Sequence, residues 1–358
     1  MTIERDVAPV SVELASHRMD DVFAGVRGVI NFLGYVASSQ EQVPRELELT
    51  VRWFFARAAR LSGAPHYCLF IAEELTTLDF KVLLDHLFNP AVQPRRSTFP
   101  KLTAAFASKT FCFISVPAPM ASLRTSIDWP LVFHECVHVL ETVAPLVPRL
   151  YPTLPKDRLL LMYRAEHGDT HAQEALWTEE LLCDFVATYI AGPAFAWRFL
   201  RQYFSILGVS YRSLTHPPVD VRIRRLINLI DGLGFKAQAK LTERLLDELL
   251  KDLKSYPPVP LPNALVAADQ IEADCKSKLQ PFDAGTYQDI LRERCRAVDS
   301  RLLQDILNRR PVVVDPGCLF TIVAFSSQCE DPGICVLLAD FMRLHAVESR
   351  FQELGLRG

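Results

Sequence analysis

The hydrophobic and polar positions of the chain mostly follow a helical period. Apolar residues recur at helical spacing along residues 22–37 and 46–61, which predicts two amphipathic helices near the N-terminus. Residues 66–72 and 110–117 are short β-like runs and predict two strands, and residues 76–88 between them have a helical pattern. We therefore expect the N-terminal third to be mixed α and β, with a small β-sheet.

The helical pattern dominates from residue 127 onward. Asp128 and Pro130 are typical of the first residues of a helix, so we expect Asp128 to cap a helix that ends near Pro145. Residues 145–171 are rich in loop-forming residues and contain one short helix. A second long helix is expected at 173–191.

Proline-containing turns separate the remaining helices. These turns are expected at Gly192-Pro193, Pro217-Pro218, 256–263, 315–320 and 331–336. The helices between or after them are expected at 194–207, from Pro218 to Gly232, at 236–254 and at 284–309. The C-terminal part of the chain is therefore expected to be helical.

These patterns predict an α+β fold that is predominantly helical. We expect three regions along the chain. Residues 1–126 would be a mixed α/β region that packs on the core, residues 127–235 a helical core, and residues 236–358 a helical C-terminal region.

Composition places the chain among ordinary globular proteins. Hydrophobic residues make up 49% and charged residues 23% of its 358 residues, which excludes a disordered chain. The net charge is −3, so nothing indicates a nucleic-acid partner. The first residues do not resemble a secretory signal, no apolar run reaches the length of a membrane helix, and the nine cysteines contain no CxxC pair. We therefore expect a soluble, cytoplasmic protein without membrane insertion.

An HExxH motif at residues 134–138 lies inside an expected apolar helix. Residues four apart lie on one face of a helix, so the imidazoles of His134 and His138 can bind the same ion. Glu135 lies beside that face, where it can act as general base for a metal-bound water. Buried histidines and an acid in an apolar helix need partners. The motif therefore predicts a site for one zinc ion, with His134 and His138 as ligands.

A catalytic zinc site needs a third protein ligand and an open position for water. The downstream candidates are His167, His171, Glu179, Glu180 and Asp184. Glu180 and Asp184 are four apart in the helix expected at 173–191, so one can bind zinc while the other accepts the N–H of a histidine ligand. We favour this pair, and we expect His167 and His171 to be solvated loop histidines.

HExxH followed by a helix with ExxxD resembles the signature of the gluzincin metallopeptidases, the thermolysin-like class. The resemblance implies a zincin-like metallopeptidase core, to which the patterns above add the small N-terminal β-sheet and a helical C-terminal extension. It also implies that Glu180 is the third zinc ligand and that Asp184 is the hydrogen-bond partner of His134. Glu179, one residue off this face, is expected to be an ordinary helical acid.

The segment T-H-P-P-V-D-V-R-I at 215–223 looks like the HPPxxxRI segment of the type I CAAX prenyl protease and HtpX-like peptidases. Those peptidases combine HExxH, an ExxxD-type helix and this segment in the same order. The resemblance implies that His216 stabilises the oxyanion of the tetrahedral intermediate and that Arg222 supports or pairs with it. From the residues alone, His216 could instead cap the following helix, and Arg222 could form a structural salt bridge.

The resemblance covers residues 128–232, and two features differ from the family. Its familiar members are integral membrane proteins, whereas this chain has no apolar run that could span a membrane, so membrane substrates do not carry over. The segment 139–179, between HExxH and the ExxxD helix, is long and could form a lid, a substrate-recognition insertion or a surface excursion. Cys136 and Cys183 flank the site, and we expect both to point away from the ligands into the core.

These features predict a zinc-dependent endopeptidase that acts on protein or peptide substrates. Glu135 would deprotonate the attacking water and later protonate the leaving amine, zinc would polarise the scissile carbonyl, and His216 would stabilise the oxyanion. Two alternatives remain open: a zinc-containing sensor or interaction protein, and a latent protease with a single dedicated partner. Water in the fourth coordination position would favour the enzyme, and a protein side chain would favour the sensor.

Overall fold

The computed structural model describes residues 43–61, 67–72, 112–117, 125–143, 146–156, 158–206, 214–251, 261–294, 315–326 and 332–353. The helices expected at 22–37 and 76–88 lie outside the described residues. The chain divides into two compact units. One is formed by Met1–Val43 and Pro65–Pro117, and the other by Pro44–Ala64 and Ala118–Gly358.

The described residues of the first unit form two strands that pair in parallel. Strand β1 covers Tyr67–Ala72 and strand β2 covers Cys112–Pro117. Their register runs from Tyr67 opposite Cys112 to Ala72 opposite Pro117. Both strands coincide with the β-like runs of the sequence. The small N-terminal β-sheet as a whole, a zincin-like core and the region boundaries at 126 and 235 stay predictions.

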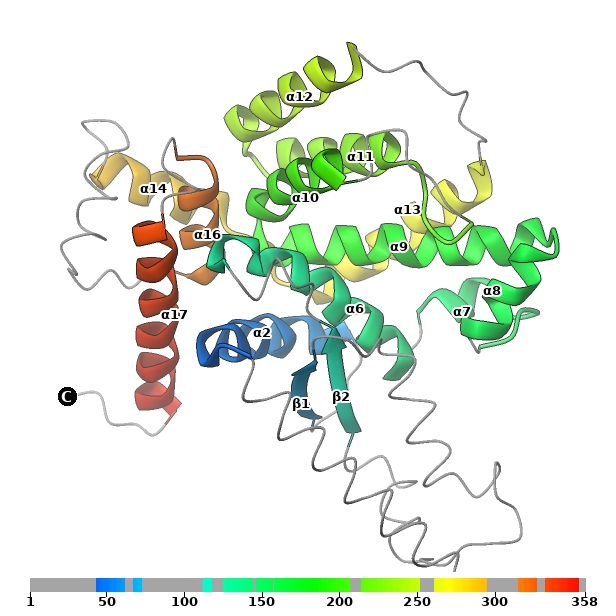
Figure 1. Ribbon diagram of the computed structural model, residues 1–358, viewed down its shortest axis with the longest axis horizontal. Coiled ribbons are helices and arrows are strands. Elements are labelled where there is room, and N and C mark those ends of the chain that lie inside the picture. The colour runs from blue at the N-terminus through cyan, green and yellow to red at the C-terminus, as the bar shows by residue number, and fades with distance from the viewer. Residues whose placement is uncertain are drawn as a thin grey trace, which may run out of the picture. The chain divides into compact units, whose positions relative to one another are not determined.

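The second unit is helical in its described residues (Figure 1). The 3-10 helices are η1 (Ala59–Leu61) and η2 (Ser126–Leu131). The α-helices are α2 (Arg45–Ala58), α6 (Val132–Val143), α7 (Val147–Leu150), α8 (Arg158–Glu166), α9 (Thr170–Ala191), α10 (Pro193–Ile206), α11 (Val219–Gly232), α12 (Lys236–Lys251), α13 (Pro262–Lys278), α14 (Ala284–Arg294), α16 (Pro316–Ala324) and α17 (Pro332–Glu353). The expectation of a predominantly helical fold is confirmed for the described residues, and α13 is a helix that the sequence patterns did not predict.

Local sequence explains where several helices begin and end. Helix α9 starts three residues earlier than expected, because the Asp169 side chain accepts the backbone N–H groups of the first turn. It ends at Gly192, whose φ of 82° is unfavourable for residues with a Cβ, and Pro193 follows. Pro218 opens α11, as the sequence predicts, and the Asp315 side chain caps α16.

The expectation that Asp128 caps the HExxH helix is wrong. A 3-10 helix, η2, precedes α6, and Thr125 occupies its N-cap position. Asp128 is buried within η2, where it accepts a hydrogen bond from Arg198 Nε of α10 at 2.8 Å. A buried carboxylate needs a charged partner more than a free helix end needs a cap, so Asp128 joins η2 to α10 instead.

Helix α9 is the central element of the second unit. Nearly all of its residues are buried, which is expected of a helix that is apolar on most of its circumference. It contacts α6, α8, α10, α11 and α13, and Figure 1 shows it passing between α6 on one side and α10 and α11 on the other. The helix that carries Glu180 and Asp184 therefore packs directly against the HExxH helix and against α11.

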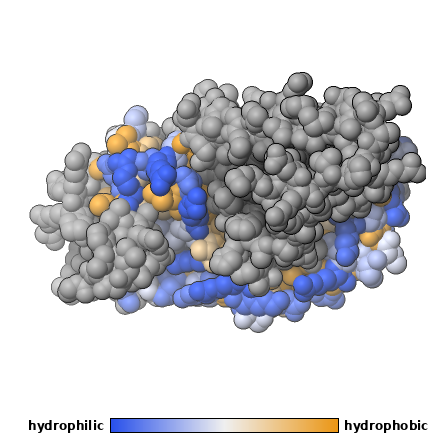
Figure 2. All heavy atoms as spheres, turned by 90° about the horizontal axis from the view of Figure 1, so that it is seen from below, coloured by the Kyte–Doolittle hydropathy of each residue, from blue (hydrophilic) through white to orange (hydrophobic). Residues whose placement is uncertain are grey.

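None of the helices in the described ranges combines the length and the apolar character needed to cross a bilayer. On the face seen in Figure 2, the described residues are mostly hydrophilic, with apolar residues in scattered spots among them. Scattered apolar residues of this kind are normal on the surface of a globular protein.

Candidate metal centre

Packing on both sides of α6 directs its two histidines toward α9. The ring of Phe133 stacks on Phe54 of α2, with centroids 4.4 Å apart, and this contact holds one face of α6. His134 and His138 lie on the other face, with ring centroids 4.8 Å apart. The ring of Phe195 lies parallel to His134 at 6.3 Å. The HExxH spacing therefore acts as expected, because both imidazoles face the same neighbour.

Carboxylates of α9 hold the Nδ1 atoms of both histidines. Asp184 Oδ1 lies 2.9 Å from His134 Nδ1, and Glu179 Oε1 lies 2.8 Å from His138 Nδ1. A carboxylate accepts, so His134 Nδ1 carries the proton and donates it, which leaves a lone pair on His134 Nε2. His138 Nδ1 lies between Glu179 Oε1 and Arg158 Nη1, which is 3.0 Å away. These contacts fix both ring orientations, as in histidine ligands of metals.

The Nε2 atoms converge with the carboxylate of Glu180. They lie 3.1 Å from each other, and each lies 3.2 Å from one oxygen of Glu180. Glu180 is 0% exposed, and its Oε2 has no hydrogen-bond donor among the described residues. Lone pairs that face one another in a buried site repel unless a proton or a metal cation lies between them.

The separations match those around a small tetrahedral cation. With zinc–ligand bonds of 2.0 to 2.1 Å, neighbouring N and O ligands lie about 3.4 Å apart. The observed separations of 3.1 to 3.2 Å are close to this value. The two imidazoles and one carboxylate are also the donor types of catalytic zinc sites. His134, His138 and Glu180 therefore fit a metal ion in both chemistry and geometry.

The pKa shifts of His134, His138 and Glu180 also result from their close approach. Burial lowers the pKa of His134, but the carboxylates of Asp184 and Glu180 beside it outweigh burial and raise it. The pKa of His138 is also raised, because the negative charges around it outweigh burial. Burial raises the pKa of Glu180, but His138 and His216 reverse this effect and hold it well below its ordinary value. The cluster thus attracts positive charge, which a metal cation can supply as well as protons.

Arg222 of α11 supports the cluster from behind. Its Nε and Nη2 donate to the two oxygens of Asp184 at 2.6 and 2.8 Å, and Nη2 lies 3.6 Å from Glu180 Oε2. The guanidinium is 1% exposed and lies over the ring of Phe199. Arg222 therefore fixes Asp184, which in turn orients His134.

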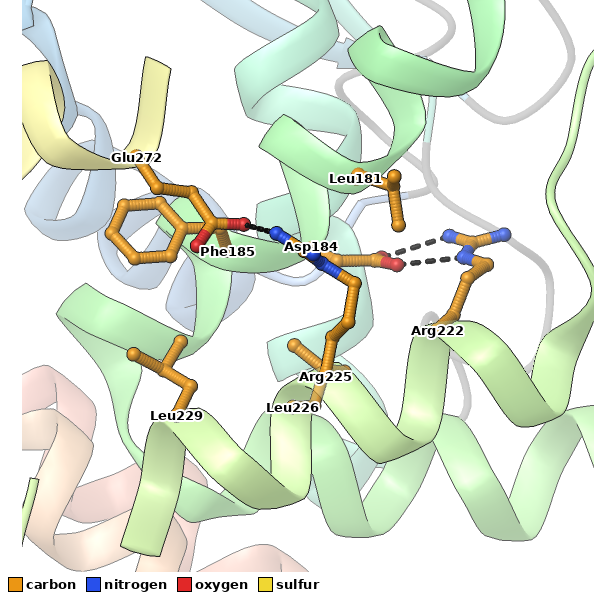
Figure 3. Close-up of a pocket in the computed structure, with 8 residues that line it drawn as sticks. All are labelled: Leu181, Asp184, Phe185, Arg222, Arg225, Leu226, Leu229 and Glu272. Carbon is orange, nitrogen blue, oxygen red and sulfur yellow. Dashed lines mark hydrogen bonds and ion pairs between the residues drawn. The ribbon is translucent and has the colours of Figure 1, made fainter. Parts of the chain in front are cut away.

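A small recess on the far side of this ion pair is not a substrate site. Figure 3 shows Asp184 and Arg222 at one end and the pair of Arg225 and Glu272, with Nη2 and Oε1 2.6 Å apart, at the other. The recess has room for little more than one water molecule. It is therefore a packing gap between α9, α11 and α13.

The structure brings His216 to the edge of the cluster. His216 Nε2 lies 3.5 Å from Glu180 Oε1, and Thr215 Oγ1 lies 2.7 Å from His216 Nδ1. The side chain is 34% exposed, so it lies where the buried cluster approaches solvent. Burial lowers the pKa of His216, and although Glu180 acts to raise it, the charges of Arg222, His134 and His138 keep it below its ordinary value, so the ring is neutral at neutral pH.

Glu135 is half-buried on α6, directly after His134. Its carboxylate makes no hydrogen bond or ion pair with another described residue, in contrast to Glu179 and Glu180 on the facing helix. A carboxylate next to the ligand face and without a fixed partner can accept a proton from a water molecule.

One acid of the site has a role that differs from the one expected from the sequence. Glu179, expected to be an ordinary helical acid, instead binds His138 Nδ1, so that expectation is wrong. The sequence contained a feature that could have indicated this role: Glu179 and Cys183 have the same four-residue spacing as the neighbouring pair Glu180 and Asp184.

Arg158 of α8 is a site residue that no sequence motif marks. Its Nη2 donates to Glu180 Oε1 at 3.0 Å, and its Nη1 donates to Glu179. Burial lowers the pKa of Arg158, but Glu179 and Glu180 outweigh this and raise it, so the guanidinium stays charged. The segment 139–179 therefore returns to the site through α8.

The other pair of histidines is solvated, as the sequence analysis expects. His167 and His171 are exposed; His167 Nδ1 lies 2.7 Å from the carbonyl oxygen of Tyr163, and His171 Nδ1 lies 3.3 Å from Glu174. His171 belongs to the first turn of α9 rather than to a loop. Because the two histidines lie in different elements, their spacing does not place them on one helix face.

A buried group of side chains could thus hold a metal ion. Besides the contacts of Glu180, the ligand atoms of His134, His138 and Cys183 lie within 4.8 Å of one another in the described part of the chain. The chain matches no protein-family model, no curated protein and no solved structure.

Proposed function

We propose that the chain is a zinc-dependent endopeptidase of the gluzincin type, which hydrolyses peptide bonds in a protein or peptide substrate. The observation that carries the proposal is the convergence of two imidazole Nε2 atoms and the Glu180 carboxylate at 3.1 to 3.2 Å, with both Nδ1 atoms held by carboxylates. This donor set, with its anchored histidines, is typical of catalytic zinc. The motif order HExxH, ExxxD and HPPxxxRI adds to it.

The residues present can perform the proton transfers of peptide hydrolysis. A bound zinc ion would supply Lewis-acid polarisation of the scissile carbonyl and lower the pKa of a water molecule. The carboxylate of Glu135 takes a proton from that water as its oxygen bonds to the carbonyl carbon. Glu135 then gives the proton to the amine nitrogen as the C–N bond breaks, which balances the reaction.

His216 and Arg222 have different roles in this proposal. His216 is neutral and partly exposed, and with Thr215 Oγ1 at its Nδ1, its Nε2 can donate to the oxyanion of the tetrahedral intermediate. Arg222 is fully buried and is bound to Asp184, so it cannot reach the substrate. It acts as a positioning residue for Asp184 and His134.

The proposal is tested by separating metal binding from cleavage. Glu135→Gln should leave the bound zinc unchanged, because Glu135 is not a ligand, but abolish cleavage of a labelled protein substrate. Glu166→Gln, an exposed acid on α8 outside the cluster, is the matched control and should keep both properties. Comparison of new protein N-termini in cells with the wild-type and Glu135→Gln chains would identify the substrates. Cleavage that survives in Glu135→Gln would contradict the proposal.

The burial of the cluster favours a second candidate function. The side chains of His134 and Glu180 are 10% and 0% exposed, so little of the cluster faces solvent. A zinc-containing sensor or interaction protein, or a latent protease with one dedicated partner, would use such a closed site. The fourth coordination position discriminates between these functions, because catalysis requires water there.

A further inference from the structure

Cys183 lies among the metal-site residues rather than apart from them. It is three residues after Glu180 on α9, and residues at this spacing lie on the same side of a helix. Its side chain is fully buried, and its Sγ comes within 4.8 Å of ligand nitrogens of both His134 and His138. The expectation that Cys183 points away from the ligands is therefore wrong.

A second observation indicates that a cation belongs beside this thiol. Glu180 Oε1 receives Arg158, whereas Oε2 is buried without a hydrogen-bond donor among the described residues and lies 3.2 Å from His134 Nε2. A buried carboxylate oxygen that accepts no hydrogen bond is costly, and Arg222 Nη2 at 3.6 Å is too far away to supply one. A cation bound to Oε2 and both Nε2 atoms would satisfy it, and that cation would lie close to the sulfur.

The reach of the sulfur is sufficient for ligation. In a tetrahedral zinc site with Zn–S near 2.3 Å and Zn–N near 2.0 Å, sulfur and nitrogen lie about 3.6 Å apart. The atoms already lie within 4.8 Å, so a small rotation of the Cys183 side chain covers the remaining distance.

We infer that Cys183 supplies a fourth protein donor to the metal, together with His134, His138 and Glu180. The inference rests on the metal site of the proposed function and concerns its regulation. Four protein donors close a tetrahedral site, so the resting chain holds its metal without a water ligand, and hydrolysis requires Cys183 to leave. A thiolate also favours zinc or cobalt over magnesium or manganese.

X-ray absorption of the zinc-loaded full chain tests the donor directly and needs no variant. We expect one sulfur at about 2.3 Å in addition to nitrogen and oxygen at about 2.0 to 2.1 Å. A spectrum that needs only nitrogen and oxygen would overturn the inference. Zinc content is measured on the same sample, and a chain that binds no zinc would overturn both the inference and the proposed function.

Cobalt substitution identifies which thiol binds. The cobalt-loaded chain should show a thiolate-to-cobalt charge-transfer band in the near ultraviolet, and Cys183→Ser should lose the band while it keeps the metal. Cys136→Ser is the matched control, since Cys136 is an equally buried thiol on the facing helix. A band that persists in Cys183→Ser would overturn the assignment. If the spectra agree but neither the wild-type chain nor Cys183→Ser cleaves protein, Cys183 stands as a ligand and the peptidase proposal fails.

Discussion

Two pairs of histidines with the same four-residue spacing have opposite surroundings in this molecule. His134 and His138 lie on one continuous helix and are buried against α9, with their Nε2 atoms 3.1 Å apart. His167 and His171 are exposed and lie in different elements, separated by the turn at Gly168. The spacing alone therefore does not make a site. It becomes one when the helix is unbroken and a second helix supplies carboxylates to the Nδ1 atoms.

The largest expected effect tests this difference directly. Replacing both His134 and His138 by Ala should reduce bound zinc from one equivalent to none, because two of the donors are lost. Replacing both His167 and His171 by Ala should leave the zinc content unchanged. Metal content is measured by inductively coupled plasma mass spectrometry on purified chains. Loss of zinc from the surface double variant would contradict the assignment of the site to α6.

The comparison also shows how far the sequence could predict the site. The face shared by His134 and His138 and the spacing of Glu180 and Asp184 follow from helix geometry, so the sequence could predict them. The contact of Arg158 with Glu180 could not be predicted, because it depends on how α8 returns to α9. The sequence predicts which residues share one face of a helix. It does not predict contacts between separate helices, because these depend on how the helices pack.

The same limit applies to the fold. The proline turns and the Asp169 and Asp315 caps are local, and most helix positions followed from them. Asp128 had the local features of a cap, but its ion pair with Arg198 of α10 determined its position instead. Helix α13 was missed because its short apolar residues, which include Ala264 and Ala268, give a weak helical pattern.

A smaller effect is expected when the fully buried and the partly buried ion pairs of α11 are compared. Arg222→Met leaves Asp184 buried without its partner, which should lower the free energy of unfolding by about 3 to 5 kcal/mol. Arg225→Met removes the ion pairs with the exposed Asp269 and the partly buried Glu272 and should cost less, on the order of 1 kcal/mol. Urea denaturation measures both. Equal losses would show that burial does not distinguish these arginines.

Anchoring of the ligands should have a more modest effect. Glu179→Gln replaces the charged acceptor at His138 Nδ1 by a neutral one, which should weaken zinc binding by about 10- to 100-fold. Glu174→Gln makes the same change beside His171 and should leave zinc affinity unchanged. Competition with a zinc chelator measures both affinities. If Glu179→Gln binds zinc with unaltered affinity, Glu179 does not anchor His138 and is the ordinary helical acid expected from the sequence.

Glu141, at the buried site on α6, and Asp169, at the solvent-facing start of α9, accept similar backbone hydrogen bonds but have opposite pKa shifts. Glu141 on α6 accepts the N–H groups of Leu146 and Val147 at 3.0 to 3.1 Å, and Asp169 accepts two N–H groups at the start of α9 at 3.0 and 3.1 Å. Burial, with the charge on Glu179, raises the pKa of Glu141 to about 8. Backbone hydrogen bonds lower the pKa of Asp169, which lies nearer solvent.

These shifts predict that the two carboxylates affect the pH dependence of stability in opposite directions. Between about pH 4.5 and pH 8, Glu141 is protonated in the folded chain and ionised in the unfolded chain, so stability falls as pH rises, by at most about 1.4 kcal/mol per unit. Asp169 has a lowered folded pKa, so its stabilisation is present above its ordinary value of 3.8 and is lost as pH falls. In urea denaturation, Glu141→Gln should flatten the fall toward high pH, whereas Asp169→Asn should change only the acid side. If the slope of stability against pH is unchanged in Glu141→Gln, Glu141 is ionised in the folded chain. Its two backbone donors would then outweigh burial, as the backbone donors of Asp169 do near solvent.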